Sequence, residues 1–279
     1  MKDSKPQDRV DWRAVGFYYL VACALSWPFF WWRDVHPESW FRWRFPAVPP
    51  ASPLTFILKM AIIMWGPGVS AVLSLTLFRK THRRTITFFG TSAYKSLAFY
   101  WVPIFIAVVV GVPMPDGSVN RFGTVALGLV TLFTMLGEEL GWRGFMQDAL
   151  RPLSPWKRYV LIGVLWEFWH FTNRTAHGSL KHVVLFLAIF YPAGVALSWL
   201  FGEATERGKS LLIAVTLHAW FDIVFTLPNA RTYVALALSI VFWILLLPRW
   251  GKDDVDAVNE EVGTEGDPRR GDALRPGRF

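Results

Sequence analysis

The chain has 279 residues, of which 53% are hydrophobic and 18% charged, with a formal net charge of +8 at pH 7. A charged fraction below the quarter that is usual in soluble domains indicates a protein embedded in a membrane. The positive charge is spread over short connecting segments without a nucleic-acid motif, so we interpret it as membrane topology and expect no nucleic-acid partner. The single cysteine, Cys23, excludes an intramolecular disulfide.

Eight apolar segments approach or exceed the length of about 20 residues that a membrane helix needs. The fifth is the shortest. The sequence therefore predicts an all-α fold, a polytopic membrane helical bundle with about eight transmembrane helices surrounded by the lipid bilayer. These segments are 14–32, 54–78, 96–114, 122–140, 159–172, 182–202, 210–228 and 232–248.

The distribution of Lys and Arg predicts the orientation of these helices. Most basic residues fall in the two terminal segments and in alternate loops, and an excess of positive charge marks the cytoplasmic side. We therefore expect both termini inside (N-in/C-in). In this scheme 1–13 is a cytoplasmic lead and 14–248 the transmembrane domain. The charged tail 249–279, poor in large apolar residues, is expected to be a disordered cytoplasmic segment.

Two adjacent carboxylates stand where the fourth apolar segment ends. Ionisable groups at membrane depth are costly unless they face a protein interior or a water-filled cavity. On a helix, Glu139 and Arg143 are four residues apart and lie on one face, where they can pair. Glu138 points about 100° away from that face and lacks this partner. The spacing predicts one anchored carboxylate and one free carboxylate.

Two later apolar segments carry histidines. His170 ends the run Trp166-Glu167-Phe168-Trp169-His170, and His218 shares a helical face with Asp222 four residues later. Either histidine alone would more often be a core residue, but their occurrence with Glu138 favours one shared site that opens toward the cytoplasm. Counted along straight helices, their depths differ from that of Glu138 by roughly two turns, so we expect a longer or tilted fourth helix.

These three motifs resemble those of a known family. Glu138-Glu139-x-x-x-Arg143 is similar to the EExxxR motif of the CAAX-protease and bacteriocin-processing family of intramembrane proteases (CPBP), whose later motifs are FxxxH and HxxxN/D. The resemblance covers about 122–227. Trp166 stands where the family usually has Phe, and Asp222 stands where many members have Asn.

The resemblance implies an intramembrane endopeptidase that hydrolyses a peptide bond in a membrane-associated peptide or protein. Glu138 would act as the base that activates water, and His170 would share that water. An ionised Asp222 cannot donate a hydrogen bond to an oxyanion, so it would have to be protonated or orient His218. The implied catalytic set is Glu138, Glu139, His170, His218 and Asp222, with Arg143 and Trp166 in support.

Two alternatives remain open at this stage. Glu138, His170, His218 and Asp222 also form a plausible ligand set for a divalent metal such as zinc, and the family is described both as metalloproteases and as glutamate proteases. The same fold would also suit a non-catalytic membrane partner, such as a bacteriocin-immunity or scaffolding protein. In either case we expect a multi-pass protein of a bacterial inner or cell membrane.

Overall fold

The computed structural model describes residues 9–35, 64–80, 82–114, 117–175 and 180–250. No strand occurs within these ranges, which confirms the predicted all-α fold. They contain eight helices of twelve residues or more, together with short helical turns. The eight are α1 (Trp12–Val35), α3 (Gly66–Leu77), α4 (Ala93–Val110), α5 (Arg121–Gly141), α7 (Pro155–Thr175), α9 (Tyr191–Gly208), α10 (Leu211–Thr226) and α11 (Ala230–Leu246).

Each predicted segment coincides with one of these helices, although several boundaries differ. The predicted segment 159–172 lengthens to Pro155–Thr175. The predicted segment 182–202 becomes a longer helical path, formed by α8 (Leu180–Leu185), a π-helical turn and α9. Only the second half of 54–78 can be compared, because 54–63 lies outside the described residues.

Half of the eight predicted segments correspond to full-length candidate spans within the residues that the structure describes. Four stretches of the described residues are long and apolar enough to cross a membrane: Ala93–Val110, Arg121–Ala149, Val183–Gly208 and Ala230–Arg249. The helices α3 and α10 are apolar but shorter. Large apolar side chains such as Ile244 and Leu245 are exposed, as expected for a surface that faces lipid. The molecule is an integral membrane protein, and its N-in/C-in orientation stays a prediction.

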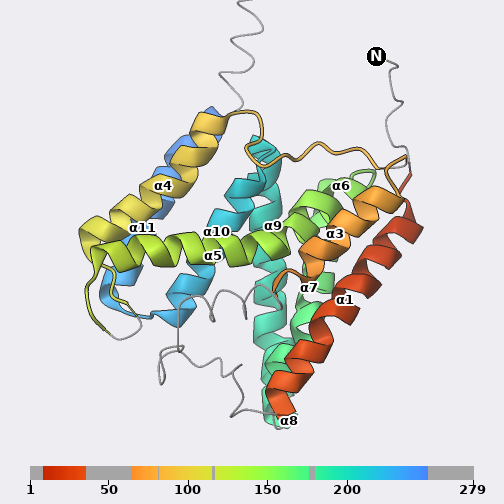
Figure 1. The fold of residues 1–279 in the computed structure, drawn as a ribbon, viewed down its shortest axis with the longest axis horizontal. Coiled ribbons are helices and arrows are strands. Elements are labelled where there is room, and N and C mark those ends of the chain that lie inside the picture. The colour runs from red at the N-terminus through yellow and green to blue at the C-terminus, as the bar shows by residue number, and fades with distance from the viewer. Residues whose placement is uncertain (1–8, 36–63, 81, 115–116, 176–179, 251–279) are drawn as a thin grey trace, which may run out of the picture.

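The helix α5 occupies the centre of the arrangement. In Figure 1 it runs across the front of the molecule, between the pair α4/α11 on the left and the pair α1/α3 on the right. It packs against α3, α4 and α10, while α7 packs against α1 and α9. Because α5 crosses its neighbours at a large angle in this view, its last turns meet residues from the middle of α7 and α10.

Small residues allow α5 to approach α3 closely. A Cβ atom added at Gly137 would lie 2.6 Å from Trp65 Cδ1, and one added at Gly141 would lie 2.7 Å from Pro67 Cβ. Both distances are too short for a real side chain, so the two glycines permit this close packing. This contact fixes the end of α5 that carries Glu138 and Glu139 against α3.

The helical path continues beyond the predicted end of the fourth segment. After α5 comes the π-helical turn η1 (Trp142–Met146), in which the Gln147 N–H donates to the Trp142 carbonyl, and then the short helix α6 (Gln147–Ala149). Such widened turns are rare and frequently lie at functional sites. Hydropathy gives no signal for one, because the change concerns only the hydrogen-bond step of the backbone.

The packed region also extends past the predicted tail boundary at residue 248. The turn η3 (Leu247–Arg249) follows α11, and Trp250 is fully buried. Its indole Nε1–H donates to Thr91 Oγ1 over 3.2 Å, and its ring packs edge-on against Phe99. The predicted disorder of the tail concerns residues 251–279, which lie outside the described residues.

Candidate active site

Glu139 is the anchored carboxylate of the adjacent pair. It is fully buried, and its Oε1 lies 2.7 Å from His218 Nδ1 and accepts a hydrogen bond from Arg143 Nη1 over 3.2 Å. Its Oε2 lies 3.0 Å from Arg143 Nη1 in an ion pair. The predicted pairing of Glu139 with Arg143 is therefore confirmed, and the carboxylate also holds one imidazole nitrogen of His218.

Arg143 is a buried cation with partners on several sides. Its Nη2 donates to Ser198 Oγ on α9 over 3.1 Å. Its guanidinium carbon lies 5.6 Å from the centre of the Trp166 ring and 5.4 Å from that of Phe201. A buried charge is stable only when it is paired and hydrogen-bonded, and these contacts supply both conditions.

Glu138 is the open carboxylate of the pair. Its Oε2 accepts a hydrogen bond from Trp166 Nε1 over 3.0 Å and lies 3.9 Å from His170 Nε2. Its Oε1 is buried and has no hydrogen-bond partner among the described residues. Buried acceptors are nearly always hydrogen-bonded, so this oxygen is the natural position for a water molecule or a reacting group.

His170 is oriented by the helix that carries it. Its Nδ1 lies 3.0 Å from the carbonyl oxygen of Trp166, one turn earlier on α7. A carbonyl oxygen can only accept, so Nδ1 carries the proton and a neutral ring presents an unprotonated Nε2 toward Glu138. Glu138 and His170 thus face the same small space from two different helices.

Trp166 lies between the two histidines of the site. Its ring lies 5.1 Å from that of His170 and 5.3 Å from that of His218, nearly perpendicular to both. It also donates the hydrogen bond that orients Glu138, which the Phe usual at this family position could not do. The departure from the usual residue therefore adds a polar contact inside the site.

Asp222 stands at the edge of this group. It lies one turn after His218 on α10 and is half-buried, whereas Glu138, Glu139 and His218 are fully buried. Its carboxylate is near enough to interact electrostatically with Glu138 and with His218. The structure thus gathers the predicted residues from α5, α7 and α10.

The same residues do not fit the predicted metal site. Within the described part of the chain, no three His, Cys, Asp or Glu side chains converge closely enough to hold a metal ion. His218 Nδ1 is in contact with Glu139 and His170 Nδ1 with a backbone carbonyl, so only the two Nε2 atoms remain as ligand positions. Because no group of three converges among the described residues, the ligand set of Glu138, His170, His218 and Asp222 is not supported by the geometry, and we derive no step through a metal.

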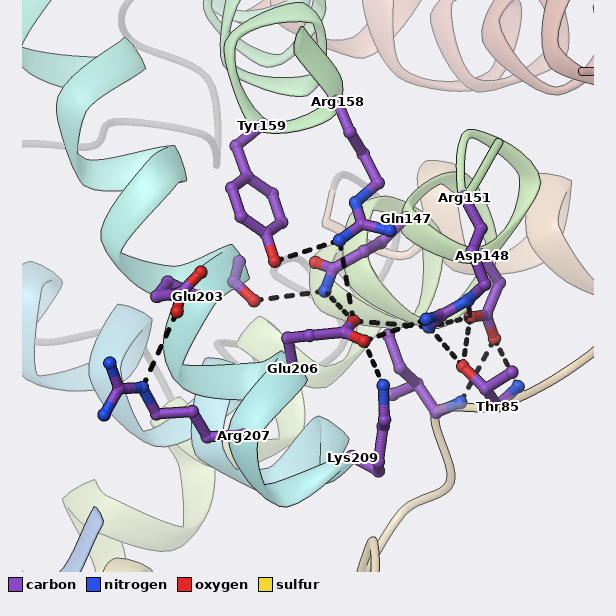
Figure 2. Close-up of polar contacts among 12 residues, drawn as sticks. Thr85, Gln147, Asp148, Arg151, Arg158, Tyr159, Glu203, Glu206, Arg207 and Lys209 are labelled. Carbon is purple, nitrogen blue, oxygen red and sulfur yellow. Dashed lines mark hydrogen bonds and ion pairs between the residues drawn. The ribbon is translucent and has the colours of Figure 1, made fainter. Parts of the chain in front are cut away.

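A second polar cluster lies next to the site, at the ends of α6 and α9 (Figure 2). Its centre is Glu206, which pairs with Arg151 Nη1 at 2.8 Å and with Lys209. We call the following residues the Glu206 cluster. They are Thr85, Gln147, Asp148, Arg151, Arg158, Glu206 and Lys209.

Asp148 is the most buried acid of the Glu206 cluster, and both of its oxygens are occupied. Oδ2 accepts the backbone N–H groups of Thr85 and Ile86 over 2.6 and 3.1 Å. Oδ1 accepts the Thr85 hydroxyl and lies 2.8 Å from Arg151 Nη2. Asp148 thereby ties the loop after α3 to the end of the helix that carries Glu138. Nothing in the sequence analysis singled out this cluster.

The sequence is similar to a known protein family and to one curated relative. Residues 120–224 match the family described as type II CAAX prenyl endopeptidase Rce1-like. The chain is also similar to CAAX prenyl protease 2 of Methanococcus maripaludis, to which it is 25% identical over 41% of this chain and 48% of that protein. The alignment thus spans about half the length of the curated relative.

The matched segment and the structural site coincide. The match begins at Asn120, whose side chain caps α5, and ends two residues after Asp222 on α10. It therefore contains all three motifs and the helices that carry them. Over residues 120–224, this chain is thus similar to the Rce1-like family of type II CAAX prenyl endopeptidases.

Proposed function

We propose that this protein is an intramembrane endopeptidase that hydrolyses a peptide bond with a water molecule activated by Glu138 and His170. The observation that carries the proposal is the Glu138 carboxylate, in a segment that matches a peptidase family. Its Oε1 is buried without a hydrogen-bond partner among the described residues, and its Oε2 lies 3.9 Å from His170 Nε2. An unpaired buried oxygen costs stability, and binding the attacking water is the function that suits the neighbours of this one.

The proposed reaction begins with a water molecule between Glu138 and His170. Glu138 removes one proton as the water oxygen attacks the carbonyl carbon of the scissile bond, which gives a tetrahedral intermediate with a negatively charged oxygen. The carbon–nitrogen bond then breaks, and Glu138 returns the proton to the departing amine. The products are a new carboxylate and a new amino terminus, and Trp166 holds Glu138 in place throughout.

His218 is proposed to face the oxyanion. Because Glu139 and Arg143 fix Nδ1, the ring presents Nε2 from a rigid position without rearranging during the reaction. A protonated imidazole there would donate to the oxyanion while the Glu139 carboxylate balances its charge.

The role of Asp222 can be tested by substitution. If Asp222 donates to the oxyanion, Asp222→Asn supplies a permanent donor of the same shape, and turnover should stay within a few-fold of the native value. If Asp222 instead acts as a carboxylate that orients His218, the same change should lower kcat by about tenfold or more. Measuring kcat and KM for the two proteins on one peptide separates these roles.

The substrate is proposed to be a membrane-associated peptide or protein. The curated relative is named a CAAX prenyl protease, but whether the substrate of this chain is lipidated is a separate question. If the protein proves to be non-catalytic, the alternative is a scaffolding or bacteriocin-immunity role on the same helices.

The test compares the free amino termini of membrane and secreted proteins in cells that express either the native protein or Glu138→Gln at matched levels. The proposal predicts a small set of amino termini that appear only with the native protein. Identical sets, with both proteins folded in the membrane, would overturn the enzymatic function and favour the scaffolding alternative.

A further inference from the structure

Three polar contacts link the helix that carries the catalytic glutamates to α9, and they repeat with one period. Arg143 Nη2 donates to Ser198 Oγ over 3.1 Å, Gln147 Nε2 to the Gly202 carbonyl over 3.1 Å, and Arg151 Nη1 to Glu206 Oε1 over 2.8 Å. Each contact joins residues 55 positions apart in the chain. We call these three contacts the ladder.

The equal spacing has a geometric meaning. Successive contacts advance by four residues in the same direction on both partners, so the two chain segments run in the same direction here. Arg143 and Gln147 lie on the helical path, whereas Arg151 lies in the turn that follows α6. In a regular α-helix, residues four apart drift by about 40° around the axis. The π-helical turn, with its wider step from Trp142 to Gln147, counteracts this drift between the first two contacts.

The ladder runs from the interior of the protein to its surface. Arg143, Ser198 and Gln147 are fully buried, whereas the side chains of Arg151 and Glu206 are 30% and 22% exposed. Its buried end continues into the active site, because Arg143 also holds Glu139, and Glu139 holds His218. Its outer end is the Glu206 cluster shown in Figure 2.

Such a ladder can define the register between two helices in a membrane. Apolar helices in lipid gain little from burying one apolar face instead of another, so interhelical hydrogen bonds and close packing decide their relative position. A slip of one turn would separate all three pairs together and leave the Arg143 charge without Ser198. The neighbouring contact is also tight, because a Cβ atom at Gly163 of α7 would lie 3.0 Å from Ser198 Cβ.

We propose that Ser198 and Gln147 are positioning residues that, through this ladder, hold Arg143, Glu139 and His218 in their reactive arrangement. The proposal rests on the endopeptidase function proposed above. Ser198 acts through Arg143. Without the hydroxyl, Nη2 keeps only the Ser198 carbonyl at 3.5 Å, so the guanidinium and the Glu139 carboxylate are free to shift. Gln147 acts one turn later by fixing the helix between Arg143 and Arg151.

The test uses a matched pair of variants on α9. Ser198→Ala removes the ladder hydroxyl, and Thr205→Val removes another fully buried hydroxyl, which has no hydrogen-bond partner among the described residues. Gln147→Met, which keeps the side-chain length and removes the donor, serves as a second ladder variant in case Ser198→Ala does not fold. Each is purified as the full chain in lipid nanodiscs.

Two readouts are taken on each protein. The first is the ¹⁵N NMR signal of His218, assigned among the six histidines by its loss in His218→Gln. The second is kcat and KM on one peptide substrate. We expect Ser198→Ala and Gln147→Met to shift the His218 signal and to lower kcat about tenfold, because small displacements of reacting groups are costly, with KM within about twofold. Thr205→Val should change neither readout.

The outcomes separate the two proposals. A native His218 signal in both Ser198→Ala and Gln147→Met overturns the positioning role, whatever their activities. A shifted signal with unchanged kcat also overturns it, because the ladder would then be structural only. If the native protein and Glu138→Gln cleave peptides equally, the proposed function fails, while the NMR comparison still decides whether the ladder holds His218.

Discussion

Glu138 and Asp148 are two buried carboxylates on one continuous helical path, and their surroundings differ in a single respect. Both oxygens of Asp148 are occupied, by two backbone N–H groups, the Thr85 hydroxyl and Arg151. Glu138 has one oriented oxygen and one oxygen without a partner among the described residues. A carboxylate whose acceptors are all occupied holds a fold together, whereas one with a free buried acceptor is available for chemistry.

Glu139 resembles Asp148 in being held by charged partners, although it is adjacent to Glu138 in the sequence. Its Oε1 contacts both Arg143 and His218, and its Oε2, which has no hydrogen bond among the described residues, lies 3.0 Å from Arg143 Nη1 in an ion pair. Its role in the site is therefore to orient His218 and balance the charge of Arg143. Neighbours in the sequence can therefore have opposite roles, because consecutive side chains on a helix point about 100° apart. The sequence analysis predicted this division between an anchored and a free carboxylate.

The largest effect is expected from removing the open carboxylate. Glu138→Gln keeps the acceptor for Trp166 but cannot take a proton from water, so turnover should fall by at least about 10³-fold. The apparent melting temperature should stay close to the native value, since no ion pair of Glu139 or Asp148 is disturbed. Turnover of a fluorogenic peptide and thermal unfolding of the same preparation check the two expectations.

The next effect comes from converting an occupied carboxylate into an open one. Arg143→Met leaves Glu139 buried without its cation, which should destabilise the fold by about 3–5 kcal/mol. The double variant Arg143→Met/Glu139→Gln removes both charges and should recover part of that loss. Denaturant unfolding of the three proteins provides the measurement. Equal stability of the single variant and the native protein would contradict the assigned pairing.

A smaller effect is expected where α5 meets α3. Gly137→Ala places a Cβ against Trp65 and the Met64 carbonyl, which should cost about 1–3 kcal/mol through overpacking. Gly144→Ala is the matched control, because its nearest neighbour, Leu140 Cδ1, would be at 3.4 Å, an ordinary contact. The control should be neutral or stabilising by up to about 1 kcal/mol. If Gly137→Ala and Gly144→Ala changed the free energy of unfolding equally, the close approach of α5 to α3 at Gly137 would not restrict the size of the side chain there.

The smallest effect concerns pH and the loop tied down by Asp148. His82 stacks on Phe145 at 4.8 Å, and burial lowers its pKa below the ordinary 6.5, with Arg84 acting in the same direction and Asp148 opposing. The fold therefore favours neutral His82, so its contribution to stability is complete above pH 6.5 and is lost as the pH falls through the lowered pKa.

His82→Phe keeps a ring against Phe145 but cannot be protonated. Its melting temperature should therefore decline less than that of the native protein between pH 7 and pH 5. Parallel declines over this range would show that His82 does not contribute to the acid sensitivity of the fold.

Much of this arrangement could be predicted from the sequence. The features that could not be predicted share one physical cause, because they depend on contacts between helices that are far apart in the chain. Hydropathy located the helices, and local spacing predicted that Glu139 pairs with Arg143, because both depend on neighbours within one helix. The partners of Arg143 and Gln147 on α9 are 55 residues away and become visible only when the helices are paired. The four-residue repeat Arg143, Gln147, Arg151 was the one signal that could have suggested such a ladder.

Other features depend on geometry that a sequence pattern does not describe. The π-helical turn after Glu139 and the crossing of α5 over its neighbours follow from tertiary packing. Trp166 was expected only in a supporting role, because nothing in the pattern shows that its indole N–H reaches Glu138. Among the described residues, four stretches are long and apolar enough to cross a membrane, and the remaining predicted spans stay a prediction.

The most direct test of the account compares Glu138→Gln with Asp148→Asn, which each remove one buried negative charge from the same helical path. We predict opposite results: Glu138→Gln loses turnover and keeps its melting temperature, whereas Asp148→Asn loses melting temperature and keeps turnover per folded molecule. The measurement is turnover and thermal unfolding of both variants in the same nanodiscs. Turnover retained by Glu138→Gln, or lost by a fully stable Asp148→Asn, would contradict the division between the open and the occupied carboxylate.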